Sequence, residues 1–172
     1  MEKQTLDETQ KERVRSKLYE YCEDGEGGLA LDEFKEFYGD FIADDSPDDE
    51  EAAFMFRGID VDESKFITFE KIIDFAEAIY FDDKHYLAKL GFRGLDENRK
   101  MRVPVNNLSM ATKLFAPGMS KETLEASIGD KIGKNCSHLK YDQYMLVVLD
   151  EKIDVDEDPY DGLGNYGCCT VH

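Results

Sequence analysis

The chain of 172 residues has a net charge of −18 and is 41% hydrophobic, which supplies enough apolar material for one compact domain or two small lobes. It has no apolar run near the roughly 18 residues that a membrane span requires, and its first ten residues do not resemble a signal peptide. Its four cysteines lack the spacing of a disulfide scaffold. We therefore expect a reduced, cytoplasmic globular protein.

The negative charge is concentrated in the first half of the chain. Residues 1–82 contain 25 Asp and Glu against 9 Lys and Arg, residues 83–150 contain 8 against 11, and residues 151–172 contain 6 against 1. An acidic field of this size repels nucleic acid and anionic lipid, and it attracts cations or basic partners. We therefore expect no nucleic-acid binding.

Apolar residues three and four positions apart predict helices along most of the chain. The segments with this pattern run from Leu18 to Cys22, Phe34 to Phe41, Phe69 to Ile79, Tyr86 to Leu90, Leu108 to Phe115, Leu124 to Ile132 and Tyr141 to Leu149. A further helix is predicted from Ser46, because Ser46 suits the N-cap and Pro47 suits the first helical position. Pro117 and Gly118 are predicted to end one helix, and Ser120 to cap the next.

A five-residue sequence occurs twice, as FRGID at Phe56 to Asp60 and as FRGLD at Phe92 to Asp96. A repeat 36 residues apart indicates repeated supersecondary units. The first copy leads into DVDESKFITFEK, Asp60 to Lys71, which resembles the twelve-residue calcium loop of the EF-hand family. Oxygen-bearing residues stand at positions 1, 3 and 5, Ile67 stands at position 8, and hydrophobic residues flank both ends.

Related frames begin at residues 22, 96 and 132. CEDGEGGLALDE, residues 22–33, departs from the EF-hand pattern only at position 1. DENRKMRVPVNN, residues 96–107, and IGKNCSHLKYDQ, residues 132–143, have lost most ligand positions, so these two loops are expected to be structural. The resemblance thus covers most of the chain and is calmodulin-like in arrangement, with four hands of which several are degenerate.

The resemblance implies an all-α fold of two EF-hand pairs, that is, four helix-loop-helix units with short two-stranded β-links between paired loops. In EF-hand proteins these links form at loop positions 7 to 9, so Leu29 is expected beside Ile67, and Val103 beside Leu139. The expected domains are residues 1–82, with loops 22–33 and 60–71, and residues 83–150, with loops 96–107 and 132–143. Residues 151–172 are expected to form a flexible acidic tail. The alternative is a helical bundle with accidental DxD patterns.

The same resemblance supplies candidate calcium ligands, because calcium binds six to eight oxygens. They are Asp24, Glu26, the Gly28 carbonyl and Glu33 in the first loop, and Asp60, Asp62, Ser64, the Phe66 carbonyl and, through a water, Thr68 in the second. Each loop has a defect: Cys22 places a soft thiol at position 1 of the first, and Lys71 removes the carboxylate at position 12 of the second. Lys65 also replaces the usual glycine at position 6. We expect Ca²⁺ to bind weakly or not at all, and only in these two loops.

Lys71 admits two interpretations. Its ammonium group can lie among Asp60, Asp62 and Ser64, where it replaces the calcium ion and holds the unit in one conformation without metal. Alternatively, its side chain extends into solvent.

The last four residues, Cys169 to His172, resemble a CaaX prenylation box, with Cys168 as a second candidate lipidation site. Thr170 and His172 are unusual for such a box, and no polybasic stretch supports membrane anchoring. The alternative is an unmodified terminus.

The chain has no phosphate-binding glycine loop, zinc signature or paired catalytic residues, so we do not expect an enzyme. The resemblance implies an EF-hand calcium-binding protein that acts as a weak calcium sensor or as an adaptor. Its partner would be a protein target such as an amphipathic helix. The alternative is a largely calcium-independent structural or light-chain-like subunit, associated with membranes through its C-terminal cysteines.

Overall fold

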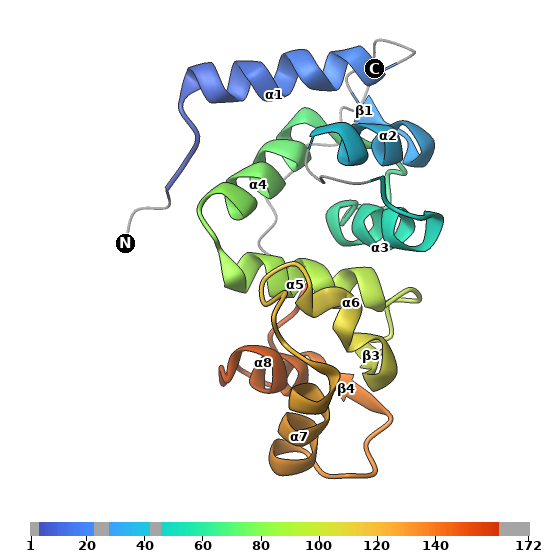
Figure 1. Ribbon diagram of the computed structural model, residues 1–172, viewed down its shortest axis with the longest axis vertical. Helices are drawn as coiled ribbons and strands as arrows, with labels where there is room; N and C mark the ends of the chain where they lie inside the picture. Colours follow the sequence, from blue (N-terminus) through green and yellow to red (C-terminus); the bar gives the residue numbers. More distant parts are fainter. Residues whose placement is uncertain (1–3, 23–27, 42–45, 162–172) are drawn as a thin grey trace.

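The computed structural model describes residues 4–22, 28–41 and 46–161, and this part of the chain is mostly helical with two small antiparallel two-stranded sheets (Figure 1). The helices are α1 (Glu8–Tyr21), α2 (Leu31–Phe41), α3 (Asp49–Ile59), α4 (Phe69–Tyr80), α5 (Lys84–Leu95), α6 (Leu108–Thr112), α7 (Lys121–Lys131) and α8 (Tyr141–Leu149), with a short 3₁₀-helix η1 (Val105–Asn107) before α6. The strands are β1 (Gly28–Leu29), β2 (Ile67–Thr68), β3 (Arg102–Pro104) and β4 (His138–Lys140). Helices α1 to α4 lie toward one end of the molecule and α6 to α8 toward the other, with α5 between them (Figure 1).

The two sheets join segments that are far apart in the sequence. β1 pairs with β2, which places Leu29 opposite Ile67, and β3 pairs with β4, which places Val103 opposite Leu139. Both predicted pairs are confirmed. All four side chains are fully buried, so each short ladder also closes the hydrophobic core between the helices on either side of it.

Side-chain caps explain where several helices begin. Asp7 and Gln10 form a reciprocal capping box at the start of α1, and Ser120 caps α7 as predicted. The predicted start of α3 is wrong by two residues: Asp48, not Ser46, is the N-cap, and its carboxylate accepts a hydrogen bond from the Glu51 backbone N–H. A charged cap interacts favourably with the helix dipole, and Pro47 is instead buried beside Gly39 of α2.

The helix predicted to run from Leu108 to Phe115 is shorter than expected. α6 ends at Thr112, and the N–H groups of Leu114 and Phe115 bond to carbonyls three residues back rather than four. The proline at position 117 disfavours a helical conformation at the preceding residue, which limits the helix from its C-terminal side.

The loops that follow α3 and α5 have the same backbone conformation. Glu63 and Lys65 in the first loop have φ values of 54° and 66°, and Arg99 and Met101 in the second have 49° and 58°. The first Asp of each loop accepts the backbone N–H five residues later, in both cases over 2.9 Å. The left-handed conformation normally favours glycine, so each loop keeps its turn at a local conformational cost.

Helices α3 and α5 approach closely at the glycines of the repeated pentapeptide. A Cβ atom added to Gly58 would lie 2.7 Å from the Leu90 carbonyl oxygen, and one added to Gly94 would lie 2.6 Å from the Phe54 carbonyl oxygen. The Arg57 Nε donates a hydrogen bond across this contact to the Gly94 carbonyl over 3.0 Å. The repeat thus lies where the first four helices meet the rest of the molecule.

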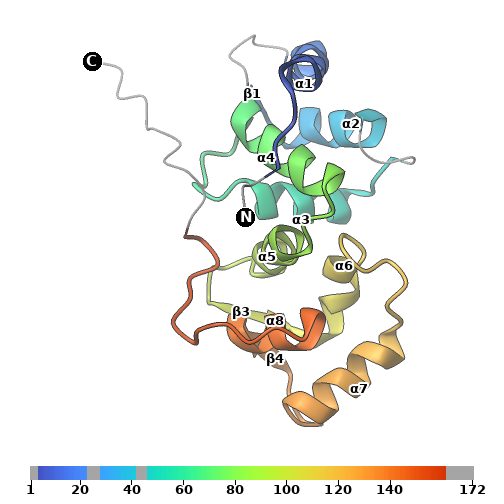
Figure 2. The same ribbon diagram turned by 90° about the vertical axis from the view of Figure 1, so that its left-hand side faces the viewer.

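Residues 151–161, which we expected to belong to a flexible tail, have defined contacts in this structure. Figure 2 shows this segment turning back from α8 along the side of the molecule toward α5. Lys89 of α5 donates a hydrogen bond to the Asp161 carbonyl, and His85 lies 3.1 Å from the Glu151 carboxylate. Acidic composition predicts solvation, but it does not reveal that α5 offers basic partners for this segment.

No helix within the described residues combines the length and the apolar character needed to cross a membrane.

Gly58→Ala is expected to lower the free energy of unfolding by about 1–3 kcal/mol, because the new methyl group forces α3 away from the Leu90 backbone. Urea denaturation followed by circular dichroism measures this change. Gly129→Ala in α7 is the matched control, since its nearest contact would be the Lys134 Cγ at 3.7 Å. The control is expected to gain about 0.5–1 kcal/mol from helix propensity. Equal stabilities of the two variants would show that the α3–α5 approach does not limit substitution.

Candidate functional site

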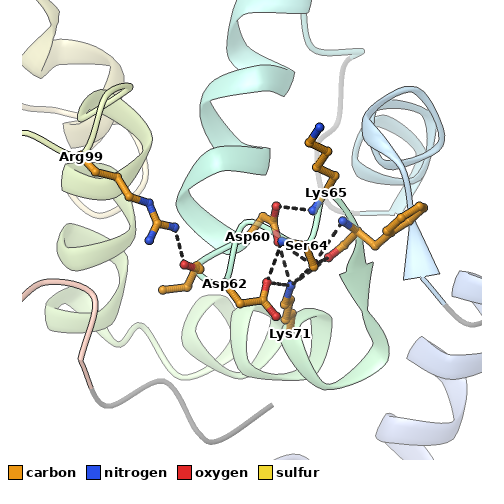
Figure 3. Close-up of polar contacts among 8 residues, drawn as sticks. Asp60, Asp62, Ser64, Lys65, Lys71 and Arg99 are labelled. Carbon is orange, nitrogen blue, oxygen red and sulfur yellow. Dashed lines mark hydrogen bonds and ion pairs between the residues drawn. The ribbon is translucent and has the colours of Figure 1, made fainter. Parts of the chain in front are cut away.

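The loop between α3 and α4 brings the polar residues predicted for calcium binding to one place. Asp60 directly follows α3, and Asp62 and Ser64 lie in the turn that comes next. Lys71 belongs to the first turn of α4, where side chains point back toward the helix N-terminus. Figure 3 shows its side chain reaching from the helix into the loop.

The Lys71 ammonium group lies at the centre of this loop. Its Nζ atom is 2.8 Å from the Asp60 Oδ1, 2.5 Å from the Asp62 Oδ1 and 2.8 Å from the Ser64 Oγ. The Phe66 carbonyl oxygen, 2.9 Å away, completes a set of four oxygens. Of the two interpretations of Lys71, the structure confirms the one in which its ammonium group lies among the loop oxygens (Figure 3).

Burial makes this arrangement strong. Lys71 is 1% exposed and Asp60 is 7% exposed, whereas Asp62 at 41% forms the outer side of the cluster. A buried ammonium is tolerated only when oxygens replace its water shell, and a lysine in the first turn of a helix is further disfavoured by the helix dipole. The hydrogen bonds to the four oxygens offset both the cost of burying the ammonium and its unfavourable interaction with the helix dipole.

The charges of the loop are coupled. Burial by itself raises the pKa of the Asp62 carboxyl, but hydrogen bonds donated by Lys71 and Ser64 outweigh burial and hold this pKa well below its usual value. Asp62 is therefore ionised at neutral pH, and it supplies a full negative charge beside the ammonium.

The loop does not fit calcium in this arrangement. Calcium binds six to eight oxygens at about 2.3–2.6 Å, and in EF-hand loops two of them come from a carboxylate at position 12. Lys71 stands at that position and puts a positive charge in the middle of the ligand set. Glu70, one residue earlier, is exposed. The buried Thr68 Oγ1 has no hydrogen-bond partner among the described residues.

The first loop is only partly covered by the described residues. Asp24 and Glu26 lie outside them. The Gly28 carbonyl accepts a hydrogen bond from the Cys22 Sγ over 3.6 Å, so the residue at position 1 contacts the carbonyl at position 7. The Glu33 Oε2 accepts the Ala30 backbone N–H over 2.7 Å, which caps the start of α2. The candidate lipidation sites Cys168 and Cys169 also lie outside the described residues.

The loop after α5 reveals residues that sequence reasoning missed. Asp96, its first residue, is buried and accepts backbone N–H groups from Lys100 and Met101, and the Tyr160 hydroxyl donates to its Oδ2 over 3.1 Å. Tyr160 comes from the segment expected to be flexible, and no sequence pattern pairs it with Asp96. Arg99 links the two loops: its guanidinium donates to the Val61 carbonyl (Figure 3) and lies 3.3 Å from Glu63.

Comparison with protein-family models and with curated proteins found no match for this chain. Within the described residues, no group of three or more His, Cys, Asp or Glu side chains is arranged to hold a metal ion.

Lys71→Met is expected to lower the free energy of unfolding by about 3 kcal/mol, because Asp60 remains buried without its counter-ion. Urea denaturation at neutral pH measures this loss. Lys35→Met is the matched control: its ion pair with Asp49 is exposed, so its removal is expected to cost less than about 1 kcal/mol. A loss as small as that of the control would contradict a structural role for the buried ammonium.

Proposed function

We propose that this protein is a non-catalytic adaptor of EF-hand architecture, in which Lys71 replaces calcium in the second loop and which binds protein targets without a calcium signal. The observation that carries the proposal is the contact of the Lys71 Nζ with three side-chain oxygens and one carbonyl oxygen. A sensor of this type must gain differential binding energy from calcium in one of two conformations. An ammonium fixed in the ligand position removes that difference.

The architecture of the described chain supports the EF-hand part of the proposal. Each β-link joins two loops at the position where EF-hand loops pair, with Leu29 opposite Ile67 and Val103 opposite Leu139. Each loop lies between two helical segments. We accordingly propose two EF-hand pairs, residues 1–82 and 83–150, in contact through α3 and α5.

An apolar groove supports the choice of a protein target. It has a volume of about 380 Å³ and is lined mainly by Leu6, Val14, Phe41, Ala76, Ile79 and Tyr80. These residues come from α4, α1, the end of α2 and the segment before α1, and both Ile79 and Tyr80 are exposed. An apolar groove of this kind accepts the apolar face of a helix.

The charge of the first half defines the partner further. Residues 1–82 have 25 acidic against 9 basic residues, so the groove lies in a strongly negative field. We therefore propose a basic amphipathic helix as the occupant, with its apolar side in the groove and its Lys and Arg residues toward the acidic surface.

Calcium titration tests the metal-independent part of this function. In the wild-type protein, amide NMR signals of residues 60–71 are expected to stay unchanged up to calcium concentrations of about 1 mM, where even weak EF-hand sites bind. Lys71→Glu removes the ammonium and restores a carboxylate at position 12, so its loop signals are expected to shift and calorimetry to detect binding. Shifts of the wild-type loop at such concentrations would refute the replacement of calcium by Lys71.

Binding of a designed peptide tests the adaptor part. A helical peptide with Leu on one face and Lys on the other is expected to bind equally well with calcium and with a chelator. Ile79→Asp is expected to weaken binding at least about tenfold, since it places a charge in the apolar groove. Tyr19→Asp on exposed α1 surface outside the groove is the control and is expected to leave fluorescence-anisotropy titrations unchanged. Equal losses in both variants would indicate nonspecific attraction to the acidic surface.

A further inference from the structure

A second pocket lies between the loops that follow α3 and α5. Its volume is about 210 Å³, and four cationic side chains contribute to its lining: Arg57, Lys65, Arg93 and Arg99. Tyr160 forms another part of the wall, where its ring lies 4.5 Å from the Arg99 guanidinium carbon. The pocket is separate from the apolar groove, and it borders the cluster around Lys71 through Asp60.

Arg93 is the unusual residue of this pocket. It is 2% exposed, and its Nε donates to the Lys89 carbonyl over 3.3 Å. Neither of its Nη atoms makes a well-aligned hydrogen bond to a described residue, and the Tyr86 hydroxyl, which interacts with the guanidinium, is a single neutral oxygen. A guanidinium remains charged in proteins, and a buried charge without a partner is costly. Arg93 therefore needs a group that accepts its hydrogen bonds.

Most of the other charges of the pocket already have partners. Arg57 pairs with Glu97, and Arg99 pairs with Glu63. Asp96 accepts hydrogen bonds from two backbone N–H groups and from Tyr160. Asp60 pairs with Lys71. The four acidic residues in the lining thus already have partners, and the Nη atoms of Arg93 still need acceptors.

Neutral phenols surround the guanidinium. The Tyr86 ring lies 5.8 Å from the Arg93 guanidinium carbon, and the buried Tyr141 hydroxyl also lacks a hydrogen-bond partner among the described residues. Burial raises the pKa of Tyr86 to about 12 and the pKa of Tyr141 well above its usual value. Both phenols are therefore protonated at neutral pH and do not neutralise Arg93.

We propose that Arg93 binds a small oxyanion, a carboxylate or phosphate group, that enters the pocket between these two loops. The two Nη atoms form a planar fork that matches two oxygens of such a group. The bound oxygens would accept the hydrogen bonds that Arg93 lacks. The pocket is large enough for the anion, and the guanidinium groups of Arg57 and Arg99, each paired with a glutamate, also lie in its walls.

The alternative to an external anion is a counter-ion for Arg93 from within the chain. Glu157 is close enough to Tyr141 and Lys89 to influence the pKa of each, so a rearranged Glu157 carboxylate is one candidate counter-ion among the described residues. Glu157→Gln removes this candidate and leaves the pocket lining intact. It therefore separates an internal ion pair from an external ligand.

Titration of the full chain with sodium acetate and, separately, sodium phosphate tests the proposal, with sodium chloride at matched ionic strength as the reference. The Arg93 side-chain Nε–H signal in NMR spectra is expected to shift and saturate with at least one of the two anions. A response to acetate identifies a carboxylate site, and a response to phosphate identifies a phosphate site. Failure of both to saturate would overturn the proposal.

Three variants complete the test, with the midpoint of thermal unfolding as a second measurement. Arg93→Met, which keeps the side-chain volume without charge, is expected to abolish the anion-dependent rise in this midpoint. Arg93→Lys keeps the charge without the fork and is expected to weaken binding at least about tenfold. Lys121→Met, an exposed charge on α7, is the control and is expected to keep the full response. An unchanged response in both Arg93 variants, or binding that appears only after Glu157→Gln, would refute the site.

Discussion

The contact of the Lys71 ammonium with four oxygens determines the form of the first half of the molecule. It joins the end of α3 to the start of α4 through Asp60, and it holds the turn that places β2 beside β1. A bound metal ion would connect the two helices in the same way only as long as the ion was present at a sufficient concentration. A covalently attached cation is always present, so this contact, unlike one made through a metal ion, does not depend on the concentration of an ion.

In the described residues, the first aspartate of a loop finds a partner for its carboxylate in two different ways, neither of which uses a metal ion. The Asp60 carboxylate pairs with the Lys71 ammonium from the start of α4. The Asp96 carboxylate instead accepts a hydrogen bond from the Tyr160 hydroxyl, more than sixty residues away. Both aspartates also accept backbone N–H groups within their loops. Such a loop therefore stays folded without a metal ion when another donor reaches its buried carboxylate.

Local periodicity predicted most of the helical segments, and both strand pairings followed from the resemblance to EF-hand loops, which sets the register of each loop. That resemblance also identified Lys71 as the decisive residue of the second loop, but left its direction open, since burial of a lysine depends on neighbours that only the folded chain brings together. The contacts of Tyr160 and Arg93 were not predicted, because they join segments with no shared pattern. The start of α3 was misjudged because Ser46 and Asp48 are both good caps, and packing of Pro47 against Gly39 decided between them.

The glycine contacts between α3 and α5 are reciprocal. Gly58 of the first pentapeptide approaches Leu90, four residues before the glycine of the second, and Gly94 approaches Phe54, four residues before the glycine of the first. Contacts that exchange in this way are isologous, the kind that two identical subunits make across a two-fold axis. The junction inside this single chain thus has the geometry of a homodimer interface, with the two pentapeptides in the roles of equivalent subunits.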